Sequence, residues 1–267
     1  MISSDFRTEA RRALDGKWGK AVLMTFAYAL VFFVLELIVN LLGKISMLAI
    51  LFNIISFVIE IPLTFGLISC LFKLYKGESV ATFDFISIGF SNFGKSWGMS
   101  LRMILKLIVP IIIFILSISL IIYAGINCVD YQVTNAQYQD INMALSNGSL
   151  TDTGAVLVLI GFIFMFVSSI WMTVKSYYYQ LTFIVAADDN SLTSAEAIDR
   201  SEKLMTGKRA KLFWLELSFI GWAILTSFTL GIGYFWLIPY MLFATFSFYF
   251  FAVKDNEKTA SNNEKTE

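Results

Sequence analysis

Five ionisable side chains lie inside strongly apolar stretches of the sequence. They are Glu36, Glu60, Arg102, Lys106 and Glu216. Because a charge in hydrocarbon is costly, an ionisable residue at membrane depth is by default a candidate for function. Such groups mark polar paths through membrane proteins or pair with one another, so these five are the candidate intramembrane polar residues.

Glu60 is the strongest of these candidates, because it falls near the middle of its stretch, two residues before Pro62. Proline has no N–H to donate and loosens a membrane helix locally. Arg102 and Lys106 are four residues apart on one helix face and could pair with Glu60 or Glu216 inside a bundle. The alternative, which we prefer, is that both cations reach the cytoplasmic headgroups.

Glu36 and Glu216 have simpler explanations. Glu36 lies in the outer half of its stretch, where burial against a neighbouring helix in the neutral form would account for it. Glu216 follows Lys211 by five residues and lies near a predicted helix N-terminus, where negative charge is favoured. A position at the membrane interface, or a pair with Lys208 or Lys211, explains Glu216.

The composition points to a membrane protein. Of 267 residues, 57% are hydrophobic and 15% are charged, whereas about a quarter of a soluble domain is charged. Histidine is absent, which excludes histidine-dependent nucleophiles, metal sites and proton relays. A formal net charge of zero gives no reason to expect nucleic acid as a partner. We therefore expect no enzyme activity, cofactor or metal.

Six segments are apolar and close to the roughly 20 residues that a bilayer requires. They lie near 21–42, 45–72, 97–123, 154–171, 212–230 and 234–253. The sequence thus predicts an all-α polytopic bundle of about six transmembrane helices, forming a single domain over 1–254. Asn, Lys, Glu, Ser and Thr dominate 255–267, which predicts a disordered tail.

Basic residues predict the orientation. Lysine and arginine gather before the first span, between the second and third, between the fourth and fifth, and after the sixth, whereas 124–153 has none and Lys44 is an exception. By the positive-inside rule, both termini lie in the cytoplasm of a plasma-membrane protein. The first span then stays as an anchor rather than a cleaved leader. Cys70 and Cys128 fall on opposite sides, too far apart for a disulfide.

Three short amphipathic helices are predicted, each followed by glycine and lysine before a span. Gly16-Lys17, Gly94-Lys95 and Gly207-Lys208 are these junctions. The expected apolar faces are Phe6, Ala10 and Leu14; Phe83, Ile86, Phe90 and Phe93; and Ala197, Ile198, Ser201, Leu204 and Met205. One hypothesis is a threefold repeat of an interfacial helix, a glycine break and a hairpin. The other is that glycine, lysine and tryptophan simply collect where helices meet the membrane.

The last of these helices has clear end signals. Thr193 and Glu196 have the spacing of a capping box, and Gly207 supplies a helix stop. We interpret both as structural signals rather than as parts of a site.

The C-terminal third carries four recognisable motifs: Thr193-Ser194-Ala195-Glu196-Ala197-Ile198, Leu204-Met205-x-Gly207-Lys208, Leu215-Glu216-Leu217-Ser218-Phe219-Ile220-Gly221-Trp222, and Thr229-Leu230-Gly231-Ile232-Gly233 through Pro239-Tyr240. The chain starts with Ala10-Arg11-x-x-Leu14-x-Gly16-Lys17-Trp18. In these motifs and in this start the chain resembles a bacterial integral-membrane family, the domain of unknown function 975. The resemblance implies a multi-pass plasma-membrane protein without an established activity. It is also distantly similar to the non-catalytic membrane domain attached to some glycerophosphodiester phosphodiesterases.

Two functions fit these observations. The first is a non-enzymatic membrane scaffold or accessory component, which would contact the lipid bilayer and a membrane-protein partner or a second copy of the chain. The second is a small transporter or permease with a polar path near Glu60 and Pro62.

Overall fold

The computed structural model of the chain describes residues 2–42, 46–127, 129–130, 149–150 and 152–263. These residues are almost entirely helical, which confirms the predicted all-α class. The elements are α1 (Ser3–Leu14), α2 (Trp18–Leu42), α3 (Ser46–Lys76), α4 (Asp84–Ser91), α5 (Phe93–Lys106), α6 (Ile108–Asn127), β1 (Val129–Asp130), β2 (Ser149–Leu150), α8 (Asp152–Ser176), the 3-10 turn η1 (Tyr177–Tyr179), α9 (Thr182–Asp188), α10 (Ser194–Met205), α11 (Arg209–Leu217), α12 (Ile220–Ser227) and α13 (Tyr234–Asn263). Lys44 and Cys128 lie outside the described residues.

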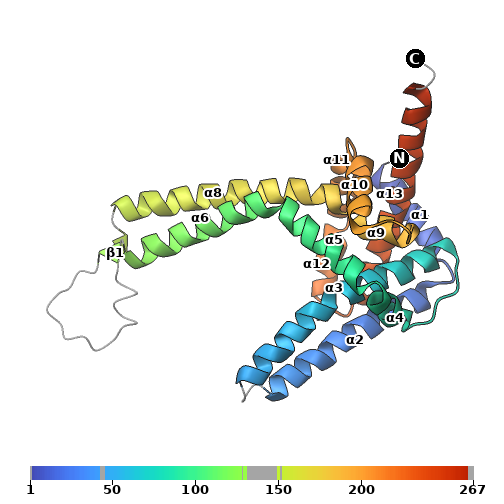
Figure 1. Cartoon of the computed structure of the whole chain (residues 1–267), viewed down its shortest axis with the longest axis horizontal. Helices are drawn as coiled ribbons and strands as arrows, with labels where there is room; N and C mark the ends of the chain where they lie inside the picture. The colour runs from blue at the N-terminus through green and yellow to red at the C-terminus, as the bar shows by residue number, and fades with distance from the viewer. Residues whose placement is uncertain (1, 43–45, 128, 131–148, 151, 264–267) are drawn as a thin grey trace. The chain divides into compact units, whose positions relative to one another are not determined.

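The chain packs as two compact units, where the sequence predicted one domain over 1–254. The smaller unit spans Ile104–Ser176. Its helices α6 and α8 lie side by side (Figure 1), and β1 and β2 pair antiparallel at their joined end. Gly161 allows this approach, since a Cβ there would come within 2.6 Å of Ile121 and 3.2 Å of the Ser117 carbonyl oxygen. The hairpin that the sequence predicted from the third and fourth spans is therefore present.

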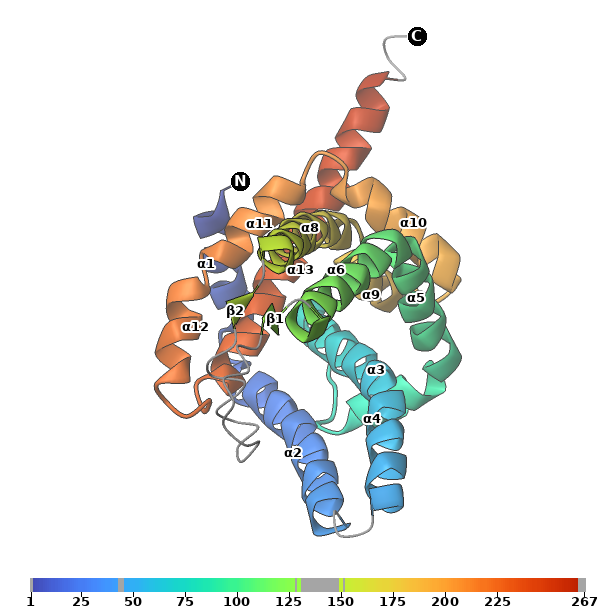
Figure 2. The same cartoon turned by 90° about the vertical axis from the view of Figure 1, so that its left-hand side faces the viewer.

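The larger unit comprises Met1–Met103 and Tyr177–Glu267, and an aromatic core joins its helices. Helices α2 and α3 form an antiparallel pair within it (Figure 2). Phe72 of α3 packs against Phe246 of α13 with the ring centroids 5.2 Å apart. Phe6 of α1 meets Phe248 and Phe251 of α13 edge to face, each at 5.6 Å. Aromatic pairs of this kind add about 0.5–1.5 kcal/mol beyond their buried area.

Five helices in the described part of the chain are long and apolar enough to cross a membrane. They are in Trp18–Leu41, Ile50–Lys76, Ile108–Ile126, Asp152–Asp188 and Tyr234–Thr259. The predicted fifth span, 212–230, is instead divided between α11 and α12, of nine and eight residues. Its break falls at Ser218, whose hydroxyl donates to the Leu215 carbonyl and whose own carbonyl accepts from Arg7. These side-chain contacts satisfy backbone groups that a continuous helix would pair.

Two further boundaries differ from the prediction. The span expected at 97–123 is interrupted at Leu107, between α5 and α6. The physical reason is Pro110, which has no N–H for the Lys106 carbonyl and whose ring crowds it. At the other end, α13 continues to Asn263, so 255–263 is helical where a disordered tail was predicted. The Lys208 ammonium lies 3.1 Å from the Asp255 carboxylate and donates a hydrogen bond to the Asn256 side-chain oxygen at 2.5 Å. These two contacts hold the extension in place.

The apolar faces predicted for α1 and α10 are buried in full. They lie against protein helices, α1 against α13 and α11, and α10 against α9, η1 and α13. The face predicted for α4 was wrong: Phe85 and Gly89 are buried, whereas Phe83 and Phe90 are exposed. The reason is a close backbone approach to α3, where a Cβ on Gly89 would lie 2.5 Å from the carbonyl oxygen of Pro62.

Two of the three glycine junctions adopt the same turn. Asp15 (φ −58°, ψ 131°) precedes Gly16 (φ +68°), and Thr206 (φ −60°, ψ 124°) precedes Gly207 (φ +74°). The following lysine N–H closes each turn at 2.8 and 3.0 Å. This is the type II turn, whose third position requires a positive φ and so favours glycine. Gly94 lies inside α5 instead, so the second junction differs from the other two.

Gly66→Ala tests the contact between α3 and α4. The added Cβ would overlap the Phe85 carbonyl group, which is backbone and cannot rotate away. We expect a loss of ~1–3 kcal/mol in unfolding free energy, measured as a lower unfolding midpoint in mild detergent. Gly19→Ala is the control, because a Cβ there meets nothing within 4 Å. Equal midpoints for the two variants would contradict the contact.

Candidate functional site

Helix α3 keeps its hydrogen bonding complete at the position where Pro62 would be expected to loosen it. Pro62 has no N–H to give the Val58 carbonyl four residues earlier. The indole N–H of Trp97 donates to that carbonyl at 2.9 Å, and its ring meets Phe57 edge to face at 5.7 Å. A side chain from α5 thus replaces the missing helix hydrogen bond. No local pattern in the sequence predicts this role of Trp97, although the tryptophan follows the Gly94-Lys95 junction.

Glu60 lies where α3 changes from an exposed helix to a buried one. Before it, Ile50, Ile54 and Phe57 are 61%, 55% and 59% exposed. After it, the core residues between Leu63 and Leu74 are each at most 5% exposed. Glu60 itself is exposed, so its carboxylate lies on the outer surface of α3 rather than inside the bundle.

Glu36 of α2 and Arg102 of α5 lie in the same unit as Glu60 but do not pair with it. Glu36 is exposed and accepts a hydrogen bond from Asn40 of its own helix at 3.1 Å. Its predicted burial against a neighbouring helix was therefore wrong. Arg102 and Lys106 are both exposed on α5. Within the described residues, Arg102 forms no salt bridge with Glu60 or Glu216, so the pairing considered for Arg102 is not present there.

Among the candidates, Glu216 has a carboxylate that accepts hydrogen bonds on both of its oxygens. The hydroxyl of Tyr177 donates to one carboxylate oxygen at 2.5 Å, and the amide of Gln180 donates to the other at 2.8 Å. The pair expected with Lys208 or Lys211 was wrong, because Lys208 binds Asp255 and Lys211 lies over the Phe251 ring. The carboxylate of α11 is thus held by two residues at and just after η1. Because both oxygens accept hydrogen bonds, the carboxylate joins α11 to the η1 segment and is not free to act as a base.

A second polar contact ties the core helices together at one end. Asp188 accepts from the Tyr249 hydroxyl at 2.8 Å and lies 3.6 Å from the ammonium of Lys76. It therefore links α9 to α13 and α3. Among the described residues, no group of three or more His, Cys, Asp or Glu side chains is placed to hold a metal ion.

The predicted capping box of α10 is confirmed. Thr193 accepts from the Glu196 N–H at 3.3 Å, and Glu196 accepts from the Thr193 N–H at 2.8 Å. Hydrogen bonds from the backbone and then the hydroxyl of Thr193 hold the pKa of Glu196 below its usual value. The contact is structural, as its spacing indicated.

Trp97→Phe tests the closure of α3. Phenylalanine keeps a ring beside Phe57 but leaves the Val58 carbonyl without its donor, so we expect a loss of ~1–3 kcal/mol in unfolding free energy. Adding Pro62→Ala supplies a backbone N–H to the same carbonyl and should recover most of the loss. Thermal unfolding of the single and double variants measures both effects. A double variant no more stable than Trp97→Phe would refute this role of the indole.

The chain matches the family model described as a protein of unknown function (DUF975) over residues 1–256. No curated protein and no solved structure matches it.

Proposed function

The chain belongs to the DUF975 family, whose function is unknown, and we propose that it is a non-enzymatic membrane scaffold or accessory component. Its apolar helices indicate a membrane protein. We place it in a bacterial plasma membrane, as the family resemblance implies. An accessory role also fits the distant resemblance that we propose to the non-catalytic membrane domain attached to some glycerophosphodiester phosphodiesterases.

The exposed position of Glu60 is the observation that carries the proposal. Ile50, Ile54 and Phe57 recur at helical spacing on α3 and are exposed, and Glu60 lies one turn beyond them. A carboxylate on an apolar face is costly against lipid and becomes favourable when a neighbouring helix offers a donor. This face of α3 therefore suits contact with another membrane helix.

A transporter would instead need its ionisable groups around a shared path. Glu36, Glu60 and Arg102 are exposed on three different helices. Glu216 is occupied by Tyr177 and Gln180, and the gap left by Pro62 is closed by Trp97. These placements favour the scaffold over the permease.

A photocrosslinking amino acid at Ile54 tests the scaffold in intact membranes. We expect one discrete protein adduct, which Glu60→Ala removes and the control Glu36→Ala leaves, because Glu36 is exposed on α2 and bonded within its own helix. The same crosslinker at Phe33, 65% exposed on α2, should not give this adduct. The scaffold function is contradicted, and the permease function favoured, if the crosslinker at Ile54 gives no adduct and a cysteine at position 60 reacts with water-soluble maleimide from both sides of the membrane.

The proposed cytoplasmic position of both termini requires an even number of crossings, whereas five helices in the described ranges are long enough to span a membrane. We propose that α11 and α12 together form a sixth, broken crossing. Ser218 (φ −66°, ψ −12°) and Phe219 (φ −96°, ψ −8°) keep near-helical dihedral angles at the break. Helices α11 and α12 follow one another along the chain in Figure 2, and each contacts α13.

Cysteine labelling in a variant without Cys70 and Cys128 tests this topology. Ile232→Cys, 58% exposed in the turn before α13, should react with an impermeant maleimide on intact cells. Arg12→Cys and Lys258→Cys, on exposed positions near the two termini, should react only after permeabilisation. Labelling of Ile232→Cys only after permeabilisation would show that α11 and α12 do not cross.

A further inference from the structure

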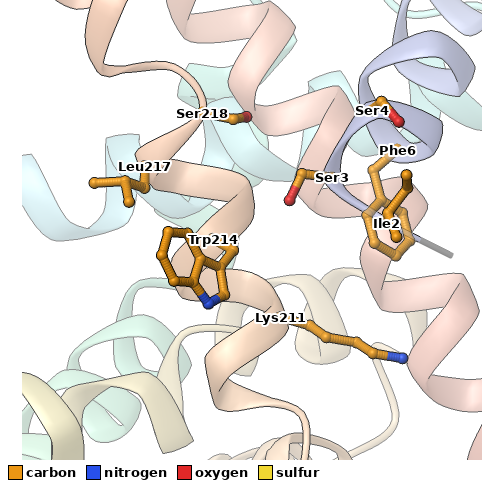
Figure 3. Close-up of a pocket in the computed structure, with 8 residues that line it drawn as sticks. All are labelled: Ile2, Ser3, Ser4, Phe6, Lys211, Trp214, Leu217 and Ser218. Atoms are coloured by element: carbon orange, nitrogen blue, oxygen red, sulfur yellow. The ribbon is translucent and has the colours of Figure 1, made fainter.

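A cavity of about 650 Å³ lies between the start of α1 and α11 in the larger unit. Figure 3 shows the side chains that line it. Most of the wall is apolar, formed by Ile2 and Phe6 of α1 and by Trp214 and Leu217 of α11. Trp214 is 60% exposed and Ile2 is 70% exposed, so the cavity opens to the surroundings of the protein.

One edge of the cavity carries a positive charge without a counter-ion. The Lys211 ammonium lies 4.7 Å above the ring centroid of Phe251, which supports the charge but does not neutralise it. In the part of the chain that the structure describes, no carboxylate forms a salt bridge with Lys211. The acidic residue of the first turn, Asp5, is engaged by the Ile2 N–H at 2.8 Å. Asp5 caps α1, so the Lys211 ammonium remains the charged group at this edge of the cavity that can bind an anion.

From this arrangement we infer that the cavity binds a bilayer phospholipid with an anionic headgroup. The phosphate pairs with Lys211, and an acyl chain lies against Phe6, Trp214 and Leu217. Lysine and tryptophan one turn apart on α11 suit the depth of the headgroups. A free phosphate would use the charge but leave the apolar wall in water, whereas a lipid covers both. The inference does not depend on the scaffold role.

Native mass spectrometry of the full chain in detergent tests the headgroup. With equal amounts of phosphatidylglycerol and phosphatidylcholine, we expect the wild type to retain phosphatidylglycerol preferentially. Lys211→Gln should lower its retention about fivefold, the change that corresponds to ~1 kcal/mol for one lysine at an anionic surface. Lys211→Arg should restore retention, and Arg12→Gln, which removes an exposed charge of α1 outside the cavity, should leave it unchanged.

Quenching by brominated phosphatidylglycerol tests the acyl chain. Trp214 should account for a quenched component of the tryptophan emission that disappears in Trp214→Phe and falls in Lys211→Gln. The inference is overturned if Lys211→Gln binds both lipids as the wild type does. It is also overturned if Trp214→Phe leaves the quenched fraction unchanged, because the lipid then lies elsewhere.

Discussion

The second half of α3 is enclosed by protein, and the larger unit is assembled around it. Phe72 contacts Phe246, Tyr249 and Phe250 of α13, with ring centroids 5.2–5.9 Å apart. Gly66 lets α4 approach on another side, and Lys76 reaches Asp188 of α9. A helix long enough to cross a membrane therefore has two environments along its length. Its first half exposes apolar side chains, and its second half is core.

This division changes the meaning of Glu60. By sequence it is in the middle of an apolar stretch, which suggested a charge inside a bundle. In the fold it is the last exposed position before the core residues that begin at Leu63. Hydropathy averages the two halves of α3 and so cannot distinguish a residue surrounded by helices from one on their outer surface. The cost of an ionised carboxylate then depends on what contacts that surface.

Features that depend on neighbours along the chain could be predicted from the sequence. The capping box at Thr193 and the buried faces of α1 and α10 follow from local spacing, and both are present. The partner of Val58 lies 39 residues away, and the two partners of Glu216 lie 39 and 36 residues away, beyond any local pattern. The face of α4 was missed for another reason. Its apolar residues surround the helix, and the approach of Gly89 to Pro62 selects the buried side.

The break between α11 and α12 has the same kind of origin. Composition makes 212–230 one apolar segment, but Arg7 of α1 binds the Ser218 carbonyl where the helix stops. Packing of α1 on α13 brings that arginine into reach, since Phe6 is fixed between Phe248 and Phe251. The same docking places the start of α1 beside Lys211 and Trp214 and so forms the cavity. The helix break and the lipid cavity are thus two consequences of one contact, the anchoring of α1 on the aromatic face of α13.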